Sequence, residues 1–243
     1  MNILITGIPR AGTTLAAALL DAEPNTVCLN EPEWQHPHPS LDAEGFARAI
    51  EADFSEVRRK ILAGIPVPDR RDADGKALTN YYDSGTNKNF VMHPLTRGNL
   101  PADFTLAMKH NGPYLAVLPE LVRLGCFDIR AVIRRPLPVL RSWRRLALPI
   151  SHGKMPNATA YWPEMKALTS AKMDLLEKQA RMLELMFARI LEYQSQVKLV
   201  RYEDIRGQGI QEAEKETADD GDIISMIRRF APSAVSLYLN PES

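Results

Sequence analysis

Cysteine is nearly absent from this chain of 243 residues, which holds only Cys28 and Cys126. Neither belongs to a pair with the spacing of a metal site, so a cysteine-based metal centre is excluded and no bound metal is expected. His36 and His38 also lack cysteine or carboxylate partners at such a spacing, and an exposed rigid loop explains them. We expect both cysteines to be buried, where a thiol acts as a small apolar group.

The chain also lacks an excess of charge and a long apolar run. Its 30 lysine and arginine residues balance 30 aspartate and glutamate residues, whereas a domain that binds duplex nucleic acid is normally basic. No run approaches the roughly 18 consecutive apolar residues of a membrane span, and no basic stretch with an apolar core precedes the first predicted strand. We therefore expect a cytoplasmic protein that binds neither nucleic acid nor a membrane.

The most informative stretch that is present runs from Gly7 to Thr14. It follows the apolar run 2–6, which predicts a strand, and precedes 15–20, which predicts a helix. Glycines let the backbone wrap around an anion, and the N-terminus of a helix attracts negative charge. The loop has P-loop spacing, but Thr13 stands where the nucleotide-hydrolysing version requires lysine. The sequence thus predicts a phosphate cradle that consists of Pro9, Arg10, Ala11, Gly12, Thr13 and Thr14.

A second basic position follows another predicted strand. Residues 127–133 have the pattern of a buried strand that ends at Arg134, and Pro136 fits the first turn of the next helix. Ser142 then lies about two turns into that helix. An arginine-rich surface helix would explain this segment as well, but a local basic cluster in a neutral chain suits a small polyanion.

Three more predicted strands, at 26–29, 105–108 and 197–200, lead to Glu31, Lys109 and Tyr202. Open α/β sheets bind their ligands at the carboxyl ends of parallel strands, so these side chains are candidates for one site. Glu31 is the candidate general base, because removing a proton from a hydroxyl can contribute roughly 10²- to 10⁴-fold to a rate. Glu33 and His110 are alternatives for this role. A solvated lysine and a strand-ending turn would explain Lys109 and Tyr202 without a ligand.

In their order along the chain, these motifs resemble those of the sulfotransferases that use 3′-phosphoadenosine 5′-phosphosulfate (PAPS), and they are nearest to the tyrosyl-protein and carbohydrate enzymes. The loop 9–14 is similar to the family's 5′-phosphosulfate loop, and Arg134 with Ser142 eight residues later is similar to its 3′-phosphate signature. The resemblance implies that Arg10 and Lys109 stabilise charge on the sulfuryl group and the leaving phosphate. It also implies that Glu31 deprotonates the acceptor and that Tyr202 lies near the nucleotide.

The chain departs from the family at three places. Arg135 replaces the aspartate that usually follows the strand-end arginine, and Ala11 replaces a serine in the loop. The segment 211–222 is acidic where many members carry a glycine-rich basic loop that closes over the adenosine. Arg228 and Arg229 are the nearest basic residues that could substitute for that loop.

The pattern of strands and helices predicts one domain over residues 1–243, a three-layer α/β/α fold with a mainly parallel central sheet, similar to the P-loop nucleoside triphosphate hydrolases. A chain of this length can bury roughly 70% of its unfolded surface, which suits a single core. Within 32–101 we expect a helix at 41–62 and then a polar insertion that shapes an acceptor pocket with Trp34, Tyr81 and Tyr82, unless it is a solvated excursion. The amphipathic helix expected at 172–193 presents either a core face or a homodimer face.

The resulting functional hypothesis is transfer of a sulfuryl group from PAPS to a hydroxyl or amine of a small-molecule, glycan or peptide acceptor. Two other classes stay open. A P-loop nucleotide or small-molecule kinase would use the same strand, loop and helix, but would need a lysine near Thr13. A non-catalytic nucleotide-binding protein would bind adenosine 3′,5′-bisphosphate and transfer nothing.

Overall fold

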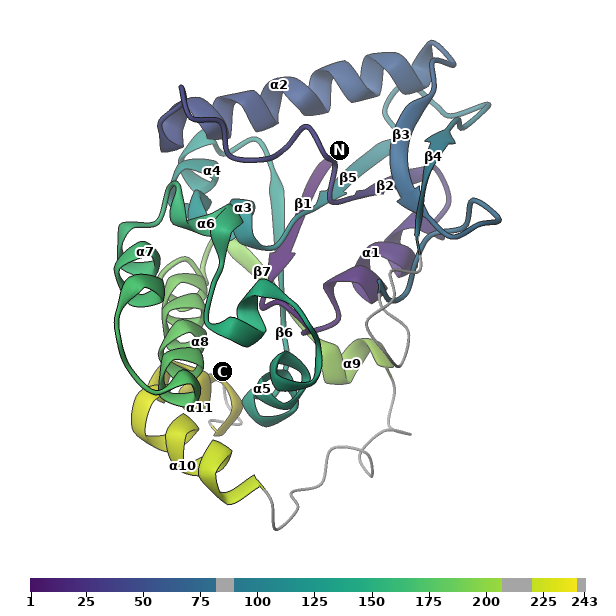
Figure 1. Ribbon diagram of the computed structural model, residues 1–243. Helices are drawn as coiled ribbons and strands as arrows, with labels where there is room; N and C mark the ends of the chain where they lie inside the picture. Colours follow the sequence, from purple (N-terminus) through teal and green to yellow (C-terminus); the bar gives the residue numbers. More distant parts are fainter. Residues whose placement is uncertain (82–89, 207–219, 240–243) are drawn as a thin grey trace.

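The computed structural model describes residues 1–81, 90–206 and 220–239 (Figure 1). A five-stranded parallel sheet forms its centre, which confirms the α/β prediction and the mainly parallel sheet. The strand order across the sheet is β2 (Thr26–Asn30), β5 (Thr105–Lys109), β1 (Asn2–Gly7), β6 (Asp128–Ile133) and β7 (Val197–Arg201). Because all five strands run in one direction, the residues at their carboxyl ends meet along one edge.

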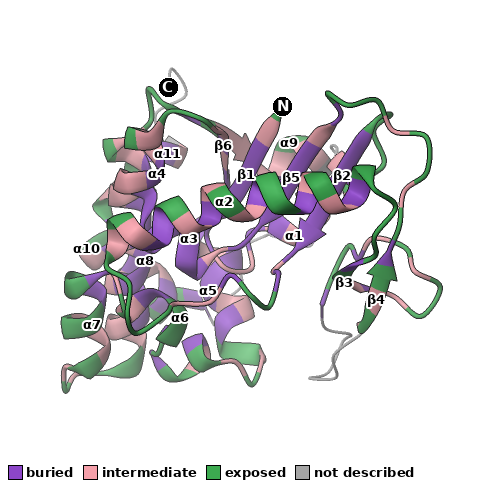
Figure 2. Ribbon diagram, turned by 90° about the horizontal axis from the view of Figure 1, so that it is seen from above, coloured by how far each residue is buried: buried purple, intermediate pink, exposed green. Residues whose placement is uncertain are grey.

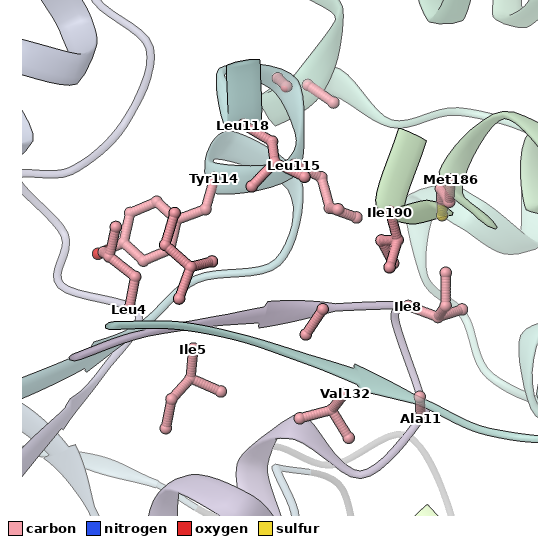
Figure 3. Close-up of a cluster of buried hydrophobic side chains, with 14 of the residues drawn as sticks. Leu4, Ile5, Ile8, Ala11, Tyr114, Leu115, Leu118, Val132, Met186 and Ile190 are labelled. Atoms are coloured by element: carbon pink, nitrogen blue, oxygen red, sulfur yellow. The ribbon is translucent and has the colours of Figure 1, made fainter. Parts of the chain in front are cut away.

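Helices flank both faces of this sheet, as a central strand that is apolar on both sides requires. Leu4 points toward Tyr114 and Leu115 on one face, whereas Ile5 and Val132 point to the opposite face (Figure 3). The first face is covered by α3 (Gly112–Ala116) and α8 (Leu175–Glu192), and α1 (Thr13–Asp21) packs on the second.

The helix α2 (Ala43–Leu62) confirms the prediction for 41–62 almost to the residue. It begins at Asp42, whose carboxylate accepts a hydrogen bond from the Gly45 N–H at 2.7 Å, as an N-cap does. Its buried side faces the sheet in Figure 2. At its far end the Arg58 guanidinium donates to the carbonyl oxygens of Phe104 and Met1. These contacts tie α2 to the amino ends of β5 and β1, opposite the edge that binds ligands in open α/β sheets.

The chain from Gly112 to Leu124 is divided into two helices, α3 and α4 (Leu118–Leu124). Pro119 has no N–H, so it cannot bond to the carbonyl of Leu115 four residues earlier. Arg189 of α8 supplies the missing donor, with its Nη1 3.3 Å from the Leu115 oxygen and 2.8 Å from the Ala116 oxygen. A proline and a distant arginine together therefore explain the break.

The amphipathic helix expected at 172–193 is α8, and its apolar stripe belongs to the core. Ala180, Leu183, Phe187 and Ile190 are fully buried. The elements not yet introduced are α5 (Pro136–Arg145), η1 (Pro149–His152), α6 (Pro156–Thr159), α7 (Pro163–Ser170), α9 (Tyr202–Arg206), α10 (Gly221–Phe230) and α11 (Pro232–Leu239). Among the described residues, no helix is long and apolar enough to span a membrane. Cys28 is buried as expected, but the prediction for Cys126 is wrong, because it lies exposed between α4 and β6.

An antiparallel hairpin, β3 (Val67–Arg71) and β4 (Val91–Leu95), stands beside β2 and was not predicted. Pro68 lies opposite Pro94 in its register, and prolines ordinarily argue against a strand. Buried polar contacts join the hairpin to β2 and to the end of α1. Asp69 accepts from the Asn30 N–H at 2.7 Å, and Arg71 contacts the Asp21 carboxylate at 2.7 Å.

Gly7, at the end of β1, has a φ of 137°, and a Cβ placed there would lie 2.1 Å from the Val132 oxygen. We predict that Gly7→Ala lowers the free energy of unfolding by about 3 kcal/mol or more, since it adds backbone strain to an overlap with rigid backbone. Gly98→Ala is the matched control, because nothing lies within 4 Å of a Cβ there. Urea unfolding of the two variants measures the difference, and equal stability would contradict the close approach of β1 and β6.

Candidate functional site

The loop after β1 makes two turns before α1 begins. The Ile8 N–H donates to the Val132 oxygen at 3.0 Å, and the Ala11 N–H donates to the Ile8 oxygen at 2.9 Å. Gly12 follows with a φ of 91° as the N-cap of α1, and no side chain caps the helix. The N–H groups of the first helical turn have no partners within the helix, so this end of α1 can bind an anion.

Tyr202, at the end of β7, closes one side of this loop. Its ring lies so near Gly12 that a Cβ at Gly12 would come within 2.3 Å of it. The Arg134 guanidinium lies 4.2 Å from the centre of the same ring. The carboxylate of Glu203 holds this arrangement in place, because it accepts a hydrogen bond from the Arg135 N–H at 3.0 Å. Arg135 thus anchors the segment that carries Tyr202.

Arg10 connects the two predicted phosphate sites. It has a φ of 71°, although it is not glycine. Its Nε donates to the Ser142 hydroxyl at 3.2 Å, and its Nη1 donates to the Asn80 side-chain oxygen at 3.3 Å. The Arg134 Nη1 lies 3.5 Å from the Arg10 carbonyl oxygen. The structure therefore brings the loop, Arg134 and Ser142 into direct contact.

The register of the sheet brings Glu31 to Lys109. Lys109 ends β5 and pairs with Asn30 of β2, and the next residue, Glu31, donates its N–H to the Lys109 oxygen at 2.7 Å. Glu31 has a φ of 47°, which turns the chain sharply after the strand. The Lys109 Nζ then lies 2.6 Å from Glu31 Oε1 and 3.3 Å from the Thr14 hydroxyl. Because its side chain is only 1% exposed, Lys109 is not the solvated lysine that its position also allowed.

Arg70 of β3 is the residue at this site that sequence reasoning missed. Its Nη1 lies 2.9 Å from Glu31 Oε2, so the two oxygens of Glu31 face two different cations. Burial acts to raise the pKa of Glu31, but the charges of Lys109, His110 and Arg70 and the Lys109 hydrogen bond lower it to about 2. Burial lowers the pKa of Lys109, and the contact with Glu31 opposes this change. Glu31 is therefore ionised at neutral pH, and its contact favours the charged form of Lys109.

The alternative bases are placed less favourably. Burial lowers the pKa of His110 to about 3, so its imidazole is neutral near pH 7, and the pKa values of His110 and Glu31 do not by themselves select the base. Its ring lies against the rings of His36 and Tyr114. Glu33 is 59% exposed and lies 3.8 Å from Arg70, on the outer side of the segment. Glu31 thus remains the candidate with the most defined surroundings.

One cavity of about 740 Å³ unites most of the predicted residues. Its lining includes Pro9, Arg10, Gly12, Thr13, Thr14, Glu31, Lys109, Arg134 and Tyr202. Ala11 is fully buried in the core beside Ile8 and does not line the cavity (Figure 3). Ser142 reaches the cavity only through its contact with Arg10.

The residues expected to shape an acceptor pocket are divided. Tyr81 lines the cavity, Trp34 does not, and Tyr82 lies outside the described residues. The apolar side chains Leu148, Ile150 and Met155, from the segment after α5, also line the cavity.

The C-terminal candidates lie elsewhere. Most of the acidic segment 211–222 falls outside the described residues, although Asp220 contacts Arg141 at 2.6 Å. Arg228 and Arg229 line a separate hollow on α10 and not the cavity, so the structure does not place them as substitutes for the missing loop. Within the described ranges, no group of three or more potential ligands could hold a metal ion.

No protein-family model matches the chain, and no curated protein matches it.

The depressed pKa of Glu31 links this site to stability. A carboxyl whose folded pKa is about 2 stabilises the protein above its unfolded pKa near 4.5, and this contribution is lost as the pH falls through 2. We predict that Glu31→Gln costs about 3 kcal/mol at pH 7 and flattens the dependence of unfolding free energy on pH between 5 and about 2.5. Urea unfolding at several pH values measures this, with Glu33→Gln as the control. An unchanged slope would mean that Glu31 is not paired in solution.

Proposed function

We propose that this protein transfers a sulfuryl group from PAPS to a hydroxyl or amine of an acceptor. One observation carries the proposal: a single cavity is lined by the uncapped end of α1, by Arg134 and by the Glu31–Lys109 pair. The two basic positions suit a donor that has phosphates at both ends of its ribose. The carboxylate of Glu31, which lies between cationic partners, suits the acceptor's proton. The central position of β1, with its loop at the carboxyl edge, supports a P-loop-like fold.

In this proposal each group has one task. The N–H groups of Gly12, Thr13 and Thr14 hold the 5′-phosphate, and Arg134 holds the 3′-phosphate, with Ser142 acting on that site through Arg10. The acceptor hydroxyl gives its proton to Glu31 while its oxygen forms a bond to sulfur. The bond from sulfur to the bridging oxygen breaks, and its electron pair stays on the 5′-phosphate of the product. Arg10 and Lys109 stabilise that charge, so the rate depends on positioning and fixed cations.

Thr13 separates this proposal from the kinase alternative. A P-loop lysine would reach the terminal phosphates of ATP, whereas the lysine that approaches this loop is Lys109, and it comes from β5. Its ammonium is bound to Glu31, where it lies between the loop and the candidate base.

Binding of nucleotides tests the two phosphate sites directly. We predict by calorimetry that adenosine 3′,5′-bisphosphate binds more tightly than AMP or ATP, and that Arg134→Ala weakens the bisphosphate about 10- to 100-fold by removing a charge-assisted hydrogen bond. Arg130→Ala is the matched control on the same strand, since Arg130 pairs with Asp128 at 3.0 Å. Equal affinity for AMP and the bisphosphate would refute the 3′ assignment.

The role of Glu31 is tested by turnover. We predict that Glu31→Gln still binds the bisphosphate but transfers sulfuryl groups from PAPS to hydroxyl and amine acceptors about 10²- to 10⁴-fold more slowly, because the proton acceptor is lost. Release of adenosine 3′,5′-bisphosphate from PAPS follows the reaction, and Glu33→Gln serves as the control. If Glu31→Gln retained full turnover, the base would lie elsewhere.

A further inference from the structure

The candidate base, Glu31, and the candidate cation, Lys109, form an ion pair with each other in this structure. Glu31 Oε1 lies 2.6 Å from Lys109 and Oε2 lies 2.9 Å from Arg70. A carboxylate clamped by two cations is a weak proton acceptor, and its pKa of about 2 reflects this. A lysine bound to a carboxylate is likewise not available to a phosphate. For the reaction to proceed, one of the two ion pairs must open.

The two cations differ in what holds them. Arg70 lies on β3 between Asp69 and Arg71, which are joined to each other at 2.7 Å and buried against β2. Its guanidinium also lies 5.0 Å from the centre of the Phe90 ring. Arg70 is not among the described residues that line the cavity. Its other described neighbours belong to the hairpin and to the segments beside it, and not to the phosphate loop.

Lys109, unlike Arg70, lies where a ligand in the cavity can contact it. It lines the cavity together with Thr14 and Glu31, and its ammonium is already 3.3 Å from the Thr14 hydroxyl on the loop. A phosphate at the N-terminus of α1 would therefore lie near this ammonium and compete with Glu31 for it. Lysine suits such an exchange, because its flexible stem carries three donors around one point charge.

We propose that Glu31 has one permanent and one exchangeable partner: Arg70 keeps the carboxylate in place, and Lys109 moves from Glu31 to the donor's phosphate. This inference rests on the proposed function of the same cavity. The exchange frees Oε1 of Glu31 for the acceptor's proton only when the donor is bound. Arg70 is then a positioning residue, which keeps the carboxylate aimed and charged after Lys109 has left.

Calorimetry with adenosine 3′,5′-bisphosphate tests the exchange without any turnover. If Glu31 competes with the ligand for Lys109, Glu31→Gln binds the bisphosphate roughly 5-fold or more tightly than the wild type. Glu31→Asp, whose shorter side chain cannot hold the ammonium at the same distance, tightens binding in the same direction and covers a failure of the first variant to fold. Glu33→Gln leaves the affinity unchanged.

The double variant Glu31→Gln/Lys109→Met separates exchange from mere loss of a negative charge. We expect it to bind no more tightly than Lys109→Met alone, because the gain needs the lysine. A gain that persisted without Lys109 would overturn the exchange, and so would an unchanged affinity in both Glu31 variants. If the wild-type protein binds no bisphosphate, both the exchange and the proposed function are refuted. The results above refute the exchange alone, so failure of the exchange and failure of the proposed function are distinguishable.

The role of Arg70 has its own readout. Among the described residues, the ionisable groups that interact with Glu31 are Lys109 at the end of β5, His110 directly after it, Arg70 on β3 and the Tyr81 hydroxyl after the hairpin's first strand. In bisphosphate-bound protein, the ¹³C resonance of the Glu31 carboxyl should titrate at a higher pH in Arg70→Met than in the wild type, and Arg70→Lys should restore the wild-type titration. An unshifted titration in Arg70→Met would show that Arg70 supports the hairpin alone.

Discussion

A lysine ammonium buried at the end of β5 is the constraint on which the site depends. An isolated buried charge is strongly unfavourable, so Lys109 requires a partner, and the parallel register of β2 and β5 places Glu31 beside it. Removing either member of such a pair would leave the other uncompensated. The pair therefore fixes the direction in which the chain leaves β2, and with it the wall of the cavity.

Backbone strain marks the same place independently. Among the residues that the structure describes, four other than glycine have a positive φ, and two of them, Asn25 and Asn99, are of the type that tolerates it. The other two are Arg10 and Glu31, both candidates for catalysis. Their side chains are held by Ser142 in one case and by Lys109 in the other. Strain of about 1–3 kcal/mol at a residue persists only where the surroundings enforce it, which favours a functional reason for both conformations.

Much of this could be predicted because it depends on local signals. Apolar runs predicted all five strands of the parallel sheet, and the rule that ligands bind at carboxyl ends predicted that Glu31, Lys109 and Tyr202 belong to one site. Sequence could not give the order of the strands, and that order decides that Glu31 meets Lys109. The sequence also could not predict that Arg70 lies at this site, since the strand that carries it, β3, is polar and the hairpin has prolines opposite each other.

The hairpin shows why local signals fail in such cases. The strand β3 has one apolar residue besides proline, Val67, which is buried in the core, and the buried contacts of Arg71 with Asp21 and Asp69 hold the rest of this strand. Alternate residues of a strand point to opposite sides, so the contacts that bury Asp69 and Arg71 direct Arg70 the other way, toward Glu31. A charged network distant in sequence thus sets the electrostatics of the candidate base. The polarity that makes 67–71 resemble a loop is what allows it to deliver a cation to this site.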